Sequence, residues 1–384
     1  MIIRNLKLKI FLIKKVFPIF SIINKRLNHK KNIIFFYCNL SFRDNNKALY
    51  DYAIEHNYNK KYKIIVSSSD YKKYVASKPD NVYFVGPLAS IFWYCLSKYV
   101  IYCIGKIPIE LGKGQKSIYL NHGMPFKDGS AGEFEQSLIM DKFFTYMLST
   151  GTAFVPSIKR IYSFPENKIV FGGNPKCDML FLPSPNYDFG EYSKLIIWTP
   201  TFRKSISMNM DDTGVDSAII PIVKVEEFDK INNFLKNINV KIVIKLHPEQ
   251  DLCKYSLTNL EYFVLLSHQE FIRRKMDINR FMKQCDAMIT DYSSIYYDFL
   301  LLNRPIGFTE DDIERYADKR GFAVDPMTFR PGMKLKTYDD ICIYAQKIAD
   351  GIDDYREERE KINSKVNEFR GGNFSKKIFE VMGI

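Results

Sequence analysis

The chain has 384 residues, of which 46% are hydrophobic and 26% are charged, a globular balance with room for two domains. The formal net charge is +12, but nine Lys or Arg residues and no acid lie between Met1 and Lys31, and removing these nine charges leaves +3 for the rest. The body of the chain is therefore not basic enough to indicate a nucleic-acid partner, and no nucleic acid is expected.

The first element, residues 1–31, mixes its cations with apolar side chains. Lys14 and Lys15 interrupt the apolar run, which is too short and too charged to span a bilayer. We expect a basic amphipathic segment in the headgroup region of an anionic membrane, although Pro18 would kink a helix there. The alternatives are a packed helix whose lysines extend to solvent, or a signal peptide that lacks a small-residue cleavage site.

After residue 31, short apolar runs alternate with amphipathic stretches, which is typical of parallel sheets with crossover helices. The strands predicted in the first half are 32–37, 63–66, 81–85, 99–102, 117–120, 143–146 and 168–171. Those predicted in the second half are 195–198, 240–244, 261–265, 287–290 and 305–308. The fold class is therefore α/β with two Rossmann-like domains. The Pro, Asn and Gly content of 182–190 predicts a linker between domains 32–181 and 191–384.

Several common sites are absent from the sequence. There is no G-x-G-x-x-G and no P-loop, which argues against a dinucleotide oxidoreductase and a P-loop NTPase. The seven cysteines form no C-x-x-C pair and are typical of reduced cytosolic residues. The five histidines have no metal-ligand spacing, so neither a metal site nor a cofactor is expected. The cleft between two α/β domains is then the expected site.

Two predicted strands end in residues suited to proton transfer or anion binding. Strand 117–120 precedes Asn121-His122-Gly123-Met124-Pro125, where His122 could accept a proton near pH 7, although a lone histidine is more often structural. Strand 195–198 precedes Thr199-Pro200-Thr201-Phe202-Arg203, where Arg203 could bind a phosphate or be a surface charge.

Two later strands end in the same manner. Lys245-Leu246-His247 follows strand 240–244 and would place two cation-capable side chains on one face if the strand continues. Strand 287–290 leads to Ser293 and Ser294, where a helix begins, and a helix N-terminus with two hydroxyls is suited to phosphate. One of these serines could instead be an N-cap, with Asp298 solvated on the helix.

Taken together, the four strand ends indicate an anionic ligand, because ligands of open α/β sheets bind beyond the carboxyl ends of the strands. Several cations and one candidate base suit a pyrophosphate donor whose leaving phosphate is stabilised while an acceptor hydroxyl is deprotonated. No D-x-D occurs in the chain, so protein cations and a helix dipole are expected in place of a divalent ion.

Six motifs, in order, resemble those of the CDP-glycerol glycerophosphotransferase family of teichoic acid synthesis. They are Asn121-His-Gly-Met-Pro-Phe-Lys127, Gly173-Asn-Pro-Lys-Cys-Asp178, Thr199-Pro-Thr-Phe-Arg203, Lys245-Leu-His-Pro248, Ile289-Thr-Asp-Tyr-Ser-Ser294 with Asp298, and Arg304-Pro305. With Arg320-Gly-Phe322, Asp325 and Pro331-Gly332, the resemblance covers roughly residues 115 to 335. The chain differs from the usual pattern at Asn121, where an aromatic residue is common, at Met124, where threonine is common, and at Cys177, where asparagine is common.

The resemblance implies a GT-B fold with two Rossmann-like domains facing across a cleft. It also implies transfer of glycerol phosphate, or a related polyol phosphate, from CDP-glycerol or CDP-ribitol to a lipid-linked glycan or polymer, releasing CMP at the cytoplasmic face of the membrane. His122 would be the base. The implied donor-binding residues are Asn121, Gly123, Met124, Pro125, Pro200, Thr201, Arg203, Lys245, Leu246, His247, Ser293, Ser294 and Asp298.

Two other classes of function remain open on the sequence alone. A GT-B glycosyltransferase using a nucleotide sugar would share the fold, but it would leave a nucleoside diphosphate as product. A non-catalytic basic protein would bind a membrane or nucleic acid mainly through residues 1–31.

Overall fold

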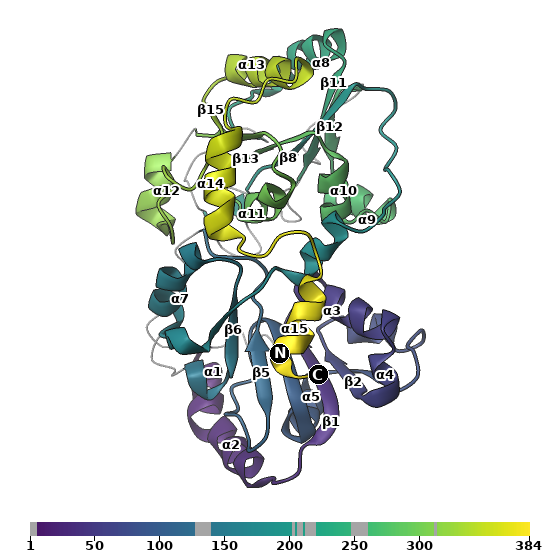
Figure 1. Cartoon of the computed structure of the whole chain (residues 1–384), viewed down its shortest axis with the longest axis vertical. Coiled ribbons are helices and arrows are strands. Elements are labelled where there is room, and N and C mark those ends of the chain that lie inside the picture. The colour runs from purple at the N-terminus through teal and green to yellow at the C-terminus, as the bar shows by residue number, and fades with distance from the viewer. Residues whose placement is uncertain are drawn as a thin grey trace. The chain divides into compact units, whose positions relative to one another are not determined.

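The computed structural model describes residues 6–126, 140–201, 204–205, 210–211, 220–246, 260–310 and 313–384. Contacts within the chain divide it into two compact units, each with its own parallel sheet and hydrophobic core (Figure 1). Unit 1 comprises Met1–Met124, Ser130–Asp178 and Glu368–Ile384, and unit 2 comprises Pro125–Gly129 and Met179–Asn367.

Unit 1 is built on a seven-stranded parallel sheet in the order β3-β2-β1-β4-β5-β6-β7. Its central strands are rich in β-branched and aromatic residues and are buried on both faces, as expected when helices cover a parallel sheet. The strands are β1 Lys31–Cys38, β2 Lys63–Ser67, β3 Val82–Val85, β4 Ser97–Ile104, β5 Lys116–Tyr119, β6 Tyr146–Ser149 and β7 Ile169–Phe171.

Helices occur in most of the described crossover segments of unit 1, but the segment between β4 and β5 contains none. The described α-helices of unit 1 are α1 Leu6–Phe11, α2 Phe17–Arg26, α3 Asp44–Glu55, α4 Tyr58–Lys61, α5 Pro87–Leu96, α7 Val155–Tyr162 and α15 Phe374–Met382. A π-helical turn, η1 Leu12–Val16, joins α1 to α2. The shorter 3-10 segments are η2 Tyr71–Tyr74, η3 Met140–Lys142, η4 Thr152–Phe154, η5 Glu166–Lys168 and η6 Pro175–Leu180, the last of which ends in unit 2.

Unit 2 is built on a six-stranded parallel sheet in the order β12-β11-β8-β13-β14-β15. The strands are β8 Lys194–Thr199, β11 Val240–Lys245, β12 Phe263–Leu266, β13 Ala287–Thr290, β14 Ile306–Thr309 and β15 Met333–Leu335. A separate two-stranded ribbon pairs β9 Lys204–Ser205 with β10 Met210–Asp211. The fully buried Trp198 and Ile289, on the neighbouring strands β8 and β13 of the six-stranded sheet, lie in the hydrophobic core of unit 2.

The described helices of unit 2 follow its strands. The α-helices are α8 Phe228–Asn237, α9 His268–Arg273, α10 Ile278–Gln284, α11 Ile295–Phe299, α12 Ile313–Arg320, α13 Tyr338–Ala349 and α14 Arg356–Val366. The 3-10 segments are η7 Val225–Glu227 and η8 Leu300–Leu302. Ser267, Asp277 and Thr337 accept hydrogen bonds from first-turn amides of α9, α10 and α13, so each helix begins at a side-chain N-cap.

Both sheets reverse strand order at one point, between β1 and β4 in unit 1 and between β8 and β13 in unit 2. This is the strand order of a Rossmann fold, in which ligands bind beyond the carboxyl ends of the strands beside the reversal. The α/β prediction with two Rossmann-like parallel sheets is therefore confirmed. The carboxyl ends of β8, β11 and β13, three neighbouring strands, and the segments after them contain most of the residues expected to bind the donor.

The structure differs from the sequence prediction in several places, two of which concern unit 1. The strand predicted at 143–146 is wrong, because β6 begins at Tyr146 and the apolar pair Phe143–Phe144 is buried between η3 and that strand. The last segment, expected in the second domain, belongs to unit 1. There the Asp178 carboxylate accepts hydrogen bonds from the backbone N atoms of Phe374 and Ser375, at 2.7 and 2.9 Å, and so caps α15.

Candidate functional site

His122 lies just beyond the carboxyl end of β5, in a turn that Asn121 makes by adopting a φ of +61°. Asparagine tolerates this left-handed conformation better than most residues. The Asn121 Oδ1 atom lies 2.9 Å from the backbone N of His122 and 3.1 Å from its Nδ1. The Asn121 Nδ2 donates to the Tyr162 hydroxyl of α7 at 3.2 Å. The imidazole is exposed, whereas the residues that shape the turn are more buried.

The backbone of this turn is held by side chains from distant parts of unit 1. The fully buried Asn45 of α3 donates from Nδ2 to the Asn121 carbonyl at 2.9 Å, and its Oδ1 accepts from the Lys176 backbone N at 3.2 Å. The Lys176 Nζ donates to the His122 carbonyl at 3.0 Å. Burial raises the pKa of the Cys103 thiol, which therefore stays protonated and donates to the Asn121 carbonyl at 3.4 Å.

The residues after His122 lead out of unit 1. Gly123 and Met124 are buried, and the Met124 Sδ accepts a hydrogen bond from the Thr150 backbone N at 3.4 Å. The chain enters unit 2 at the half-buried Pro125. Phe126 is then packed edge-on against Tyr296 of α11, with ring centroids 5.5 Å apart. Its carbonyl accepts from the Ala323 backbone N at 2.9 Å, so the end of the described turn is anchored within unit 2.

In unit 2, the ends of β8 and β13 are joined by one buried carboxylate. Asp291 directly follows β13, and its two oxygens lie 3.1 and 2.9 Å from the backbone N of Thr201. It also accepts from the Thr201 hydroxyl at 2.5 Å and from the Tyr292 backbone N at 2.6 Å. Thr201 follows Pro200 after β8, so Asp291 fixes both segments at the reversal of the sheet.

Lys245 is the last residue of β11, on the other side of β8. Its half-buried side chain donates from Nζ to the Leu246 carbonyl at 3.1 Å and lies 5.4 Å from the centroid of the Phe271 ring. Leu246 itself is buried and pairs through its backbone N with Leu266 at 3.2 Å. Lys245 therefore supplies a positive charge at the sheet edge, while Leu246 has a packing role.

Ser293 and Ser294 are half-buried residues at the start of α11. Ser294 occupies the N-cap position, but its side chain makes no capping hydrogen bond. The other end of this short helix is held by α14, because Asn367 donates to the Tyr297 carbonyl at 2.7 Å and Asn363 to the Leu300 carbonyl at 2.8 Å. Asp298, expected to contact the donor, is only 3% exposed.

The structure brings together part of the set expected from the sequence. Pro200, Thr201, Lys245, Ser293 and Ser294 lie at the ends of three neighbouring strands of unit 2, whereas Arg203 and His247 lie outside the described residues.

The sequence did not single out Asn45, Lys176 or Asp291 as site residues. An acidic residue directly after a buried strand was the available signal for Asp291. No sequence pattern near Asn45 indicates its hydrogen bond to Asn121, which lies 76 positions further along the chain.

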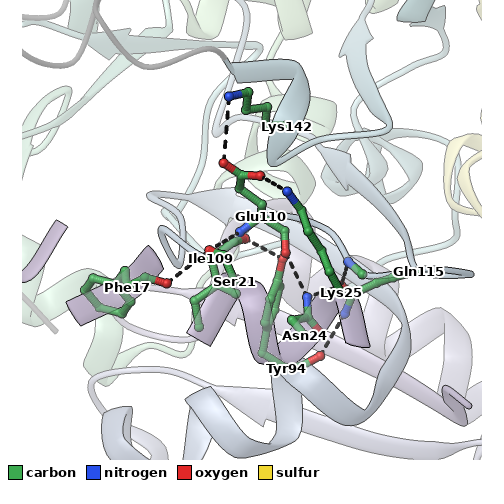
Figure 2. A network of polar contacts seen from close by, with 10 residues as sticks. Phe17, Ser21, Asn24, Lys25, Tyr94, Ile109, Glu110, Gln115 and Lys142 are labelled. Carbon is green, nitrogen blue, oxygen red and sulfur yellow. Dashed lines mark hydrogen bonds and ion pairs between the residues drawn. The ribbon is translucent and has the colours of Figure 1, made fainter. Parts of the chain in front are cut away.

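The N-terminal helix α2 packs against the rest of unit 1 through polar side chains, which Figure 2 shows pointing towards Glu110 and Gln115. Asn24 donates from Nδ2 to the Glu110 carbonyl at 2.8 Å and to the Gln115 Oε1 at 3.0 Å. The Ser21 hydroxyl accepts from the Glu110 backbone N at 3.0 Å, and Lys25 forms an ion pair with the Glu110 carboxylate. Polar residues thus form the buried face of the helix.

The opposite face of α2 is apolar and exposed, with Ile19, Ile22 and Ile23 at 57%, 53% and 47% exposure. Leu8 and Phe11 of α1 are also about half exposed. The segment is therefore inverted relative to a surface helix of a globular protein, which buries its apolar side. No helix among the described residues has the length and apolar character needed to cross a membrane.

The family model, the curated relatives and the TagF structures agree on one group. The family model described as CDP-glycerol:poly(glycerophosphate) glycerophosphotransferase matches residues 19–382, which extends well beyond the six motifs. The chain is 24% identical to the teichoic acid poly(glycerol phosphate) polymerase of Bacillus spizizenii over 98% of each chain. It is 22% identical to the teichoic acid glycerol-phosphate transferase of Staphylococcus aureus over 96% of each. The solved structure of the wall teichoic acid polymerase TagF, 19% identical, matches with a TM-score of 0.70 over 98% of this chain and 94% of that one.

Proposed function

Because the chain belongs to the CDP-glycerol:poly(glycerophosphate) glycerophosphotransferase family, we propose that His122 is the general base of its transfer reaction. The chain is a phosphotransferase of the kind that acts in teichoic acid synthesis, and it moves glycerol phosphate from a CDP-linked donor to a growing polymer. The observation that best supports the base is the exposed imidazole of His122 at the end of β5, on a turn held by Asn45 and Lys176.

In the proposed reaction, an acceptor hydroxyl oxygen attacks the phosphorus that carries glycerol. A bond forms between that oxygen and the phosphorus, and the bond from the phosphorus to the bridging oxygen of the pyrophosphate breaks, so that CMP leaves. The proton of the hydroxyl passes to His122. Positioned bases of this kind contribute about 10²- to 10⁴-fold to a rate.

The donor pyrophosphate is assigned to the sheet edge of unit 2. Lys245 supplies a cation, and Ser293 and Ser294 supply hydroxyl groups, at the ends of strands on either side of β8. Arg203 and His247 complete this set in the proposal, and Pro200 and Thr201 adjoin the cytidine or glycerol. A cation that hydrogen-bonds a leaving phosphate stabilises the charge that develops in the transition state.

The acceptor is assigned to a lipid-linked glycan or polymer, and the protein to the cytoplasmic face of the membrane. The support is the inverted helix α2, whose exposed Ile19, Ile22 and Ile23 would enter the acyl boundary of the bilayer. Exposed cations of the same segment, including Lys14, Lys15 and Arg26, would attract anionic headgroups.

The base is tested with His122→Ala and His122→Gln, by measuring CMP release and donor binding separately. Turnover should fall about 10²- to 10⁴-fold while donor affinity changes little, because the base acts on the acceptor. A variant that folds, binds donor and turns over at the wild-type rate would rule out His122. Comparison of CDP-glycerol with CDP-ribitol on a lipid-linked acceptor identifies the polyol.

Membrane binding is tested by co-sedimentation with phosphatidylglycerol vesicles. The triple variant Ile19→Gln, Ile22→Gln and Ile23→Gln should lose binding without losing stability, since these side chains are about half exposed. A matched triple, Ile272→Gln, Val75→Gln and Ile352→Gln, changes exposed apolar residues elsewhere and should bind as the wild type does. Equal binding by both triples would contradict the membrane assignment.

A further inference from the structure

The hydrogen bonds around Asn121 determine which way its side chain faces. The backbone N–H of His122 can only donate, and it lies 2.9 Å from one terminal atom of the Asn121 carboxamide. That atom must therefore be the oxygen, because the nitrogen of the carboxamide would place two donors against each other. The nitrogen then donates to the Tyr162 hydroxyl at 3.2 Å. Burial raises the pKa of Tyr162, so its phenol stays neutral and can accept.

The same oxygen determines the tautomer of His122. Its Nδ1 lies 3.1 Å from the Asn121 Oδ1, and a carboxamide oxygen accepts but cannot donate. The contact is a hydrogen bond only when Nδ1 carries a proton. In the neutral imidazole the lone pair is then on Nε2, the nitrogen on the far side of the ring.

We propose that Asn121 is a positioning residue that holds His122 as the Nδ1-protonated tautomer and so assigns Nε2 as the atom that takes the acceptor proton. This inference rests on the proposed role of His122 as base. It gives Asn121 a different role from the donor contact that the family resemblance implies.

The turn is built to keep this geometry. The Asn121 carbonyl receives hydrogen bonds from Asn45 and Cys103, and the His122 carbonyl receives one from Lys176. The two peptide groups that flank His122 are thus fixed, which limits rotation of the backbone between the Asn121 carboxamide and the imidazole. An aromatic residue, which is common at this position in the family that the chain resembles, has no carboxamide oxygen that could accept a hydrogen bond from Nδ1.

The charged and titratable groups around the turn of His122 come from four elements. Lys176 of η6 donates to the His122 carbonyl, and Asp44 of α3 acts on the thiol of Cys103 of β4, which donates to the Asn121 carbonyl. Tyr162 of α7 is neutral. Asn121 adds no charge, so it selects a tautomer without committing His122 to the protonated form.

The tautomer is tested directly by ¹⁵N NMR of the wild-type protein labelled at histidine, with His122→Gln used to assign the signal. At a pH where His122 is neutral, the proton should be found on Nδ1. A proton on Nε2 would overturn the proposal, and this readout does not depend on activity.

The role of Asn121 is tested with two variants that suit a positive φ. Asn121→Asp places a carboxylate beside Nδ1–H and should raise the acidic limb of the pH profile of kcat by about one to two units. Asn121→Gly keeps the turn and removes the carboxamide, so kcat should fall by about 10-fold or more while the donor KM stays within about twofold. Asn57, exposed and also left-handed at a φ of +59°, provides Asn57→Asp as the matched control with an unmoved profile.

The outcomes separate this inference from the proposed function. If His122→Ala keeps wild-type turnover, the base assignment fails and the role of Asn121 fails with it. If His122→Ala is inactive but Asn121→Asp leaves the acidic limb in place, only the role of Asn121 is overturned. A shift of the acidic limb in Asn121→Asp, together with a proton on Nδ1 of the wild type, supports both the base assignment and the role of Asn121.

Discussion

The turn of His122 in unit 1 and the edge of the sheet in unit 2 are fixed by different chemistry. Amides and a bond to the backbone hold the first: Asn45 and Asn121 are amides, and the Lys176 cation donates to the His122 backbone carbonyl. A single buried carboxylate, Asp291, holds the second through the backbone and hydroxyl of Thr201.

This difference follows from what each region has to do. A base must change its protonation state during turnover, so amides orient it without the strong pKa shift that a neighbouring carboxylate would cause. A donor-binding edge must keep its shape, and hydrogen bonds to a charged acceptor are about twice as strong as neutral ones. The turn of unit 1 thus allows the charge of His122 to change, whereas Asp291 in unit 2 keeps the shape of the donor-binding edge constant.

The largest effect on stability is expected at Asp291. Asp291→Ala leaves the buried amides of Thr201 and Tyr292 without their acceptor, which costs about 1–3 kcal/mol for each group. The free energy of unfolding should fall by about 3–5 kcal/mol, measured by urea denaturation. Thr201→Val, which removes only the hydroxyl bond, should cost about 1 kcal/mol. Equal losses in the two variants would show that Asp291 is not the organising group.

The next largest effect concerns donor binding. Lys245→Gln removes the cation at the end of β11 and should raise the donor KM by about 10- to 100-fold, equivalent to about 1.5–3 kcal/mol for a charged hydrogen bond. Lys241→Gln is the matched control on the same strand, because Lys241 is buried and donates to the Phe189 carbonyl. That control should lower stability and leave the donor KM unchanged. The assignment of Lys245 fails if its variant has the wild-type KM.

A smaller effect sharpens the description of the base turn. Asn45→Ala removes the buried amide that binds the Asn121 carbonyl and should cost about 1–2 kcal/mol of stability together with a loss of kcat. Asn46→Ala offers a matched control, because Asn46 is equally buried but donates to the Tyr37 carbonyl. Steady-state CMP release by the folded fraction should distinguish the two. A normal kcat in Asn45→Ala would mean that the turn does not need this bond.

The smallest effect expected is at Asp325 in unit 2, and it depends on pH. A hydrogen bond from the Thr328 hydroxyl lowers the pKa of Asp325, with support from the backbone N atoms of Met327 and Thr328. Because the pKa is lower in the folded state, the stabilisation is present above the unfolded value of about 3.9 and is lost as the pH falls through the folded value. The free energies of unfolding of wild type and Thr328→Val should differ at pH 6 and become similar at pH 3, as measured by unfolding curves at the two pH values.

Much of the fold could be predicted because a buried parallel strand is a continuous apolar run, which is a local property of the sequence. Residues 32–37 and 287–290 coincide with β1 and β13 within one or two residues. Strand β15, Met333–Leu335, was missed because it is short and contains Lys334. Residues 143–146 were predicted wrongly because Phe143 and Phe144 are buried without being part of a strand.

The candidate site was predictable only as strand ends. His122, Lys245 and Ser293 were found because each follows an apolar run, and parallel strands carry such residues to one edge of their sheet. The contacts that orient them could not be predicted, since Asn45 and Asn121 are 76 positions apart and Asp291 and Thr201 are 90 positions apart. Pairings over such separations depend on strand order, which no local pattern in the sequence specifies.

The return of α15 to unit 1 has a consequence for the order in which the protein folds during synthesis. Phe374 lies so close to Gly173 that a Cβ there would come within 2.1 Å of its ring, and Ile378, Phe379 and Met382 are buried in the core where α15 packs against α3 and β5. These residues are translated after the whole of unit 2. Domains generally fold from the N-terminus as they emerge from the ribosome, but here the core of unit 1 stays incomplete until α15 has been translated. Unit 2, although it is later in the sequence, is the first whose described core is complete.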